Sequence, residues 1–288
     1  MSVTFSGCAG LACGEWLSFG SPDLPSDQRS VAQYHACWTS PPLTESLHVL
    51  GRATVELDCA LDTEEGQVYT ALCHVMNSKG GGFRLLTFGL LNLTGKERQV
   101  VRVEMDAIGY SLPPGDSLLV MVSPGSFPTS WPSPSLSTLS ISSGTLSLPT
   151  TDLHSPRLEN WFSRPDLSPR LGPAKEVEVI RADTFTREVR AGLSDTVKTV
   201  TTDTDEGCKY FPDVDTIVEE RSRDVYTITG DDPLSAEAYC YRDCIIIYQV
   251  QCHFKLPVTD CLTIVPPGEE GADPHQDPDS DGELDEVR

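Results

Sequence analysis

One stretch, residues 109–132, restricts the fold of this chain more than any other. A turn at Pro113–Gly115 cannot continue a helix, because proline lacks the backbone N–H and glycine favours turn conformations. The apolar run Leu118–Val122 that follows is short and predicts a strand buried on both faces. The next ten residues hold three prolines together with Phe127 and Trp131. A turn, a core strand and a rigid aromatic loop in this order are typical of β-sandwiches.

Alternation of apolar and polar residues predicts strands on both sides of this stretch. From Leu47 to Leu61, apolar residues share one parity, while Arg52, Glu56 and Asp58 share the other. Similar short runs separated by Gly, Pro or Asn turns follow at Val68–Met76, Phe83–Leu91, Val100–Met105 and Leu136–Leu148. The sequence therefore predicts an all-β fold, an antiparallel jelly roll or β-sandwich.

Composition divides the chain into five parts. We expect an irregular lead-in (1–46), a jelly-roll sandwich (47–150), a Pro-rich linker (151–174), further antiparallel strands (175–265) and a disordered acidic tail (266–288). Strand candidates in the fourth part are Glu176–Arg181, Thr196–Thr202, Asp224–Thr229 and Glu237–Phe254.

The net charge and the cysteine content limit the classes of partner and the cellular compartment that we expect for this chain. The 288 residues include 43 Asp and Glu against 21 Lys and Arg, a formal charge of -22. Such a chain repels nucleic acids and anionic lipids, so we expect neither as a partner. No apolar run is long enough for a membrane span, and the first residues do not resemble a signal peptide. Ten cysteines are then expected to be reduced thiols in a cytoplasmic protein, with disulfides as the alternative if it is exported.

The sequence predicts no catalytic centre of its own. A serine hydrolase of the α/β type needs a Gly-x-Ser-x-Gly elbow, and this pattern does not occur. We expect no catalytic residue and no cofactor.

Metal sites are likewise not expected. His48 and His74 are interpreted as satisfied sheet residues, and His35 near Cys37 lacks a second pair at zinc-finger spacing. We interpret a cluster of four cysteines as buried thiols rather than as a metal site: Cys240, Cys244, Cys252 and Cys261. The acidic tail resembles the start of an EF-hand loop at Asp277, Asp279 and Asp281, and we interpret it as solvated and without calcium. Asp231–Pro233 is interpreted as a turn at a strand end.

Aromatic residues offer the clearest candidates for an interface. Trp38, Tyr110, Phe127 and Trp131 could form an apolar patch. Ordinary core packing is the competing interpretation and is favoured for Phe127. Trp131 lies among prolines and is the better interface candidate. We therefore expect the lead-in and this loop to form a surface that covers another domain.

Several motifs occur along the chain in a recognisable order, namely Asp27-Gln28-Arg29, Pro42–Glu45, Gly51, residues 112–132 and Tyr226–Leu234. Together they resemble the C-terminal part of the CocE/NonD hydrolases, a family that includes Xaa-Pro dipeptidyl-peptidases, cocaine esterase and glutaryl acylases. The resemblance implies a galactose-binding-like jelly roll. One departure is Gly115-Asp116-Ser117, where the family usually has Gly-His-Arg, so a role for that basic pair is in doubt.

The resemblance also implies a function. In that family the nucleophilic serine, acid and histidine lie in an α/β-hydrolase domain that precedes the Asp-Gln-Arg segment. The present chain is then expected to act as scaffold, pocket wall or homo-oligomer contact for such a domain, in cis or as a separate chain, in the hydrolysis of peptides, esters or amides. The alternative is a stand-alone jelly-roll binding module for carbohydrate.

Overall fold

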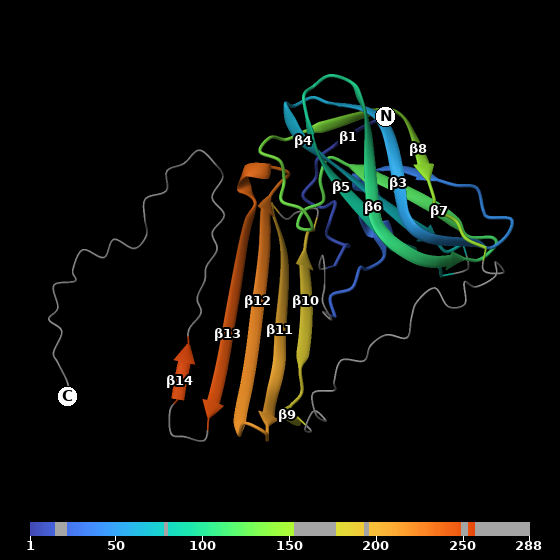
Figure 1. Cartoon of the computed structure of the whole chain (residues 1–288). Coiled ribbons are helices and arrows are strands. Elements are labelled where there is room, and N and C mark those ends of the chain that lie inside the picture. The colour runs from blue at the N-terminus through green and yellow to red at the C-terminus, as the bar shows by residue number, and fades with distance from the viewer. Residues whose placement is uncertain (15–21, 78–79, 153–176, 193–195, 249–252, 257–288) are drawn as a thin grey trace, which may run out of the picture.

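Two four-stranded sheets face each other in the described part of the first half of the chain (Figure 1). The computed structural model describes residues 1–14, 22–77, 80–152, 177–192, 196–248 and 253–256. Sheet A has the order β1-β8-β3-β6, with strands Ser2–Thr4, Thr138–Ser147, Leu47–Leu61 and Gln99–Leu112. Sheet B has the order β2-β7-β4-β5, with strands Ala36–Thr39, Ser117–Ser123, Glu65–Val75 and Phe83–Thr94. All neighbouring strands are antiparallel, which confirms the predicted β-sandwich.

A third sheet, sheet C, forms a single layer of long strands beside the sandwich (Figure 1). Its order is β10-β11-β12-β13-β14, and β9 also pairs with β11. The strands from β9 to β14 span Glu178–Arg181, Thr184–Arg190, Val197–Phe211, Thr216–Thr229, Glu237–Tyr248 and His253–Leu256. The additional C-terminal antiparallel strands are therefore present.

The core of the sandwich follows from the alternation in the sequence. On β3, Val49, Val55, Leu57 and Cys59 are buried, whereas Glu56 is exposed. These side chains meet the inner face of sheet B in one apolar cluster, to which Leu72, Leu112 and Val122 also belong. The predicted dry and wet faces of this strand are confirmed.

Sheet B is buried on both faces, which explains why β4 and β7 are apolar at both parities. Tyr69, Cys73 and Met121 point away from sheet A into a second apolar cluster. The lead-in supplies the other side of that cluster with Cys8, Leu11, Ala12, Cys13 and Val31. The lead-in therefore packs on the outer face of sheet B, and whether the lead-in and the aromatic loop also cover another domain stays a prediction.

The structure differs from two expectations for the first half of the chain, namely the irregular lead-in and the end of the strand Val100–Met105. The lead-in is not wholly irregular, because it contributes the edge strands β1 and β2 and two short 3-10 helices, η1 (Gln28–Ser30) and η2 (Ala32–Tyr34). Strand β6 continues to Leu112 because its second half pairs with the start of β3 across a register shift at Arg52.

Sheet C also differs in detail from the expected strands. Strand β10 was not expected from the sequence. The expected single strand Glu237–Phe254 is instead two antiparallel strands, β13 and β14. Most of the linker 151–174, all of the acidic tail 266–288, and Cys252, Cys261 and the EF-hand-like acids lie outside the described residues. Within the described residues, no helix has the length and apolarity that crossing a membrane requires.

Candidate interface sites

The Asp-Gln-Arg motif fixes the lead-in onto sheet B. The carboxylate of Asp27 accepts hydrogen bonds from the backbone N–H of Phe83 (3.0 Å) and from Nε of Arg29 (2.7 Å). Arg29 is the main reason why the pKa of Asp27 falls to about 2, and the Phe83 N–H adds to this effect against the opposing effect of burial. Gln28 is buried, and its Nε2 donates to the carbonyls of Ala12 (2.7 Å) and Ser26 (2.8 Å). The motif is therefore a structural clamp in this chain.

Replacing Gln28 with leucine should lower the free energy of unfolding by about 1–3 kcal/mol, because carbonyls of the buried lead-in would lose their side-chain donor. Urea denaturation followed by tryptophan fluorescence measures this loss. The matched control is Arg29→Lys, because Arg29 is exposed and surface ion pairs contribute little. Equal stability of Gln28→Leu and the parent chain would contradict the clamp.

The aromatic loop after β7 packs against the chain itself. Phe127 is 1% exposed and clusters with Phe5, Ile228 and Ala236. The half-buried ring of Trp131 meets Phe127 edge-on, with centroids 6.2 Å apart. Because Ile228 and Ala236 belong to sheet C and its adjoining turn, this loop contacts sheet C. Phe127 is therefore a core residue, which is the interpretation that the sequence analysis favours.

Gly10 shows how closely the lead-in approaches that loop. Its N–H donates to the carbonyl of Phe127 (3.1 Å). A Cβ atom at this position would lie 2.5 Å from the carbonyl oxygen of Ser126 and 2.6 Å from that of Phe127. Only glycine fits such an approach without displacing backbone.

The other two aromatic candidates lie elsewhere, so the four do not form one patch. Trp38 lies on β2 and is 42% exposed at a cavity between the two sheets. Tyr110 lies on β6 and is half-buried, with its ring 5.7 Å from that of His74. Whether any of them contacts a partner stays a prediction.

His74 is a satisfied sheet residue, as the sequence predicts. Its Nδ1 is 3.0 Å from Oη of Tyr110, and its Nε2 is 2.8 Å from a carboxylate oxygen of Asp116. Asp116 also accepts the backbone N–H of Asn77 (3.0 Å), which is the first cause of its lowered pKa, followed by His74. Both ring nitrogens of His74 therefore have hydrogen-bond partners on neighbouring strands and turns. Asp116, which stands where the family usually has histidine, is part of this hydrogen-bond network with His74 and Asn77.

His35 is buried on the lead-in side of sheet B. Its Nδ1 is 3.0 Å from the carbonyl of Val31, and burial lowers its pKa to about 4, so the ring is neutral at physiological pH. Among the described residues, no group of three or more His, Cys, Asp or Glu side chains could hold a metal ion.

The described cysteines differ in how far they are buried. Cys8, Cys13, Cys59, Cys73 and Cys208 are buried, and burial is the main cause that raises the pKa of Cys73. The three half-buried thiols are Cys37, Cys240 and Cys244. Raised pKa values disfavour the reactive thiolate form, so at Cys73 a packing role is favoured over chemistry.

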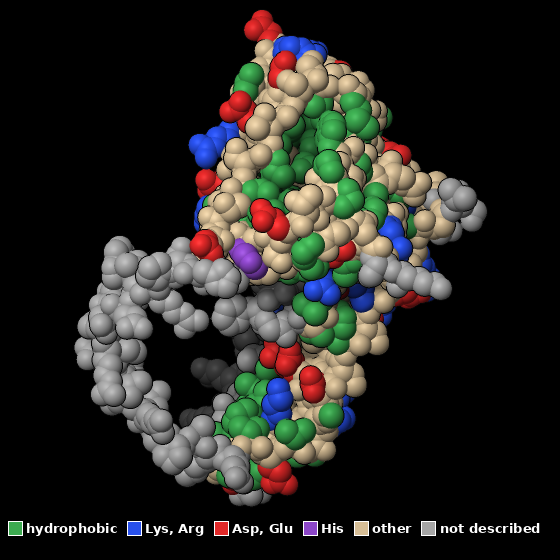
Figure 2. Space-filling model, turned by 90° about the vertical axis from the view of Figure 1, so that its right-hand side faces the viewer, with side chains coloured by type: hydrophobic (Ala, Val, Ile, Leu, Met, Phe, Trp, Pro, Cys, Tyr) green, Lys and Arg blue, Asp and Glu red, His purple; other side chains and the backbone are tan. Residues whose placement is uncertain are grey.

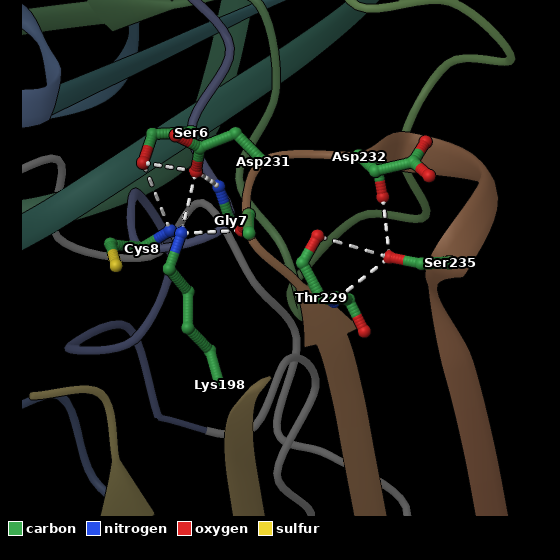
Figure 3. Close-up of polar contacts among 9 residues, drawn as sticks. Ser6, Gly7, Cys8, Lys198, Thr229, Asp231, Asp232 and Ser235 are labelled. Carbon is green, nitrogen blue, oxygen red and sulfur yellow. Dashed lines mark hydrogen bonds and ion pairs between the residues drawn. The ribbon is translucent and has the colours of Figure 1, made fainter. Parts of the chain in front are cut away.

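A polar latch that sequence reasoning missed joins the lead-in to sheet C (Figure 3). One carboxylate oxygen of Asp231 accepts hydrogen bonds from Oγ of Ser6 (3.0 Å), the N–H of Gly7 (3.0 Å) and Nζ of Lys198 (2.6 Å). Lys198 also donates to the carbonyl of Gly230 (2.5 Å), and its side chain is 13% exposed. Desolvation alone would raise the pKa of Asp231, but these donors outweigh it and the pKa is lowered.

The rest of the Asp231–Pro233 turn is structural as predicted. Asp232 caps the 3-10 helix η3 (Pro233–Ser235) by accepting the N–H of Leu234 (3.1 Å). Ser235 bonds back to Thr229 and Asp232 (Figure 3). The resemblance pointed to this segment, but its link to residues 6 and 7 depends on tertiary structure.

A second ion pair also joins the lead-in to sheet C, and we call this region of contact the junction. Nε of Arg187 on β10 lies 2.9 Å from a carboxylate oxygen of Asp23, and Nη1 donates to the carbonyl of Leu11 (3.0 Å). Both side chains are largely buried. Sheet C is therefore joined to the sandwich through the lead-in by charge pairs as well as apolar contacts.

The comparison with protein-family models shows to which family this chain is related. A family model described as the X-Pro dipeptidyl-peptidase C-terminal non-catalytic domain matches residues 7–160, which is more than half of the chain. The chain belongs to this family. The resemblance inferred from the sequence is confirmed, and the matched range includes the lead-in from Gly7 onward and every strand of the sandwich except β1.

The solved structures that are similar to this chain are distant from it in sequence. An aminopeptidase from a marine sediment Thaumarchaeota archaeon is 13% identical, with a TM-score of 0.45, 53% of this chain covered and 33% of that one. An α-amino acid ester hydrolase is 17% identical, with a TM-score of 0.45 and coverages of 52% and 32%. A CocE/NonD family hydrolase from Staphylococcus aureus is 11% identical, with a TM-score of 0.35 and coverages of 52% and 33%.

The chain thus matches about a third of the length of each of these structures. No curated protein matches it.

Proposed function

We propose that this chain serves as the C-terminal β-sandwich of an X-Pro dipeptidyl-peptidase or CocE/NonD-type serine hydrolase. The α/β-hydrolase catalytic domain supplies the chemistry, either in the same polypeptide or as a separate chain. The family match over residues 7–160 carries the proposal. In this role the chain provides scaffold, pocket wall or homo-oligomer contacts for a catalytic domain that cleaves peptides, esters or amides.

The contacts that hold the lead-in between the sandwich and sheet C support a scaffold role. The lead-in is clamped by Gln28 and packed against the Phe127 loop, and the charge pairs of Asp231 and Arg187 hold sheet C to it. A surface that positions a neighbouring domain must itself be held in one geometry. Free thiols such as those of Cys13 and Cys73 support our proposal of a cytoplasmic location.

Carbohydrate binding is the weaker candidate. The cavity beside the exposed Trp38 is lined largely by apolar side chains. Sugar recognition requires converging polar groups as well as an aromatic ring. We therefore do not propose it.

The proposal is tested on the native product. An antibody against the chain should recover, from its source cells, a serine hydrolase that a fluorophosphonate probe labels and that cleaves Xaa-Pro-p-nitroanilide or p-nitrophenyl esters. A labelled band that also reacts with the antibody above 31.4 kDa supports a catalytic domain in cis, and a separate labelled band supports one in trans. Recovery of the chain without a labelled hydrolase would overturn the proposal.

A further inference from the structure

One face of sheet C carries a hollow of about 480 Å³ that is lined by residues of β10, β11, β12 and β13, and we call it the sheet C hollow. The strand register arranges its side chains in two rows across the sheet, and a threonine of β10 ends each row. One row holds Asp205, Arg221 and Asp243, and the other holds Asp203, Arg223 and Tyr241. The rows are two residues apart on every strand, so all these side chains lie on the same face. The hollow therefore brings acidic, basic and aromatic groups together.

The sheet C hollow is open to solvent. Tyr241 is 47% exposed, and the side chains of Arg221 and Arg223 are 58% and 57% exposed. Figure 2, which views the right-hand side of Figure 1, shows acidic and basic side chains intermixed on the lower half of the molecule, where sheet C lies. The groups of the hollow are therefore accessible to a ligand from solution.

The charged groups of the hollow compensate one another. Nε of Arg221 lies 3.2 Å from a carboxylate oxygen of Asp205, and Nε of Arg223 lies 3.6 Å from a carboxylate oxygen of Asp203. Three aspartates and three arginines line the hollow, so their formal charges sum to zero. An ionic ligand would meet charges of both signs in equal number, and the acidic chain as a whole repels anions. Charge complementarity therefore favours a neutral ligand.

The paired groups keep hydrogen-bonding capacity toward the hollow. A guanidinium group has five N–H donors and a carboxylate accepts through two oxygens, so one ion pair saturates neither partner. Tyr241 lies directly opposite Arg223 on the neighbouring strand, which places an aromatic ring beside these donors and acceptors. A sugar ring presents an apolar C–H face and a rim of hydroxyl groups that both donate and accept. The hollow offers partners for both, and its volume lies in the usual range of ligand sites, about 300–1,000 Å³.

We propose that the sheet C hollow binds a neutral oligosaccharide. The exposed ring of Tyr241 stacks on the C–H face of one sugar, while Arg223 and Asp203 in the same row exchange hydrogen bonds with its hydroxyl groups. The cavity beside Trp38, for which we do not propose carbohydrate binding, is lined largely by apolar side chains and lacks this combination. Residues 184–243 follow the range that the family model matches, so the inference goes beyond the proposed function and does not rest on it.

Isothermal titration calorimetry of the full chain tests the inference with four neutral probes, namely maltopentaose, cellopentaose, xylopentaose and mannopentaose. We expect at least one of them to bind saturably with a Kd below about 1 mM. Its affinity should stay the same between about 0.05 and 0.5 M salt, because screening weakens only interactions between charges. Absence of binding by all four probes would overturn the inference. So would an anionic probe, pentagalacturonate, that binds more tightly than every neutral probe and is weakened by salt.

Variants of two tyrosines on the same face of β13 locate the site. Tyr241→Ala should weaken binding at least about tenfold, because the stacking ring is lost. Tyr239→Ala is the matched control, since Tyr239 lies two positions away, outside the hollow, where its hydroxyl donates to Glu237 (3.0 Å). The control should bind like the parent chain, and circular dichroism verifies that both variants are folded. Equal losses in the two variants would contradict the role of Tyr241.

Two further comparisons separate the hollow from other surfaces. Arg223→Met should also weaken binding at least about tenfold, because donors from a charged group are lost. Arg190→Met should not, since Arg190 lies on the same face of sheet C outside the hollow, beside Glu188 (2.8 Å). Trp38→Ala should leave the affinity unchanged. Binding that is lost in Trp38→Ala and retained in Tyr241→Ala would place the sugar in the other cavity and overturn the inference.

Discussion

Replacing Phe127 with alanine should lower the free energy of unfolding by about 3–5 kcal/mol, which is the usual cost of removing a fully buried aromatic ring. The ring is 1% exposed and joins the aromatic loop to Phe5 of the lead-in and Ile228 of sheet C. Its loss should therefore also loosen the junction between the sandwich and sheet C. Urea denaturation gives the total loss, and hydrogen exchange of the amides near Ile228 reports on the junction.

Trp131→Phe is the matched control for this prediction. Trp131 is half-buried beside Phe127, so exchanging one aromatic ring for another should cost far less. A loss below about 1 kcal/mol in Phe127→Ala, with unchanged exchange near Ile228, would contradict the junction, because fully buried aromatic truncations do not behave so.

The second large effect is expected at the latch. Asp231→Ala removes the acceptor of Lys198, Ser6 and Gly7, and should cost about 1–3 kcal/mol because the largely buried ammonium would be left without its carboxylate. The pKa of Asp231 is lowered in the folded chain from its ordinary value of 3.8. Its contribution to stability is therefore complete above about pH 4 and is lost as the pH falls through the folded pKa.

Unfolding at a series of pH values checks this prediction. The difference in stability between the parent chain and Asp231→Ala should be constant near neutral pH and should shrink as the pH falls below about 4. Asp27 and Asp116 also have lowered pKa values, but they are present in both chains and cancel in the difference. A difference that grows on acidification would contradict the latch. Lys198→Met should reproduce the neutral-pH loss.

Local sequence patterns predicted most of the sandwich because alternating or continuous apolar residues mark its strands. The strict alternation of Leu47–Leu61 gave the bounds of β3, and the run Leu118–Val122 gave β7 to within one residue at each end. The apolar residues at both parities of Val68–Met76 agree with the interior place of β4 in sheet B. It did not show that the lead-in covers the outer face of sheet B, because residues such as Cys8 and Leu11 have no periodicity and only tertiary contacts bury them.

The candidate sites were less predictable than the fold. The buried position of Phe127 was the favoured interpretation, but no sequence signal pairs Asp231 with Lys198 or His74 with Asp116. These contacts join residues 33 and 42 positions apart, and the bond from Ser6 to Asp231 spans 225. Spacing within a helix or a hairpin cannot indicate such pairs. The one hint was the departure at Asp116, where the change of residue type marked a position with a different partner.

The pairing of β1 with β8 also has a consequence for biosynthesis. Met1 and Ile141 are 140 positions apart, so the first strand leaves the ribosome long before its partner exists. At about 5–20 residues per second, this interval is roughly 7–30 s. Throughout that time β1 lacks its partner, and once β3 has been synthesised, the edge of β3 that later pairs with β8 is also open. A nascent chain of this protein therefore exposes aggregation-prone strand edges for seconds, and chaperones that bind extended segments have that period in which to act.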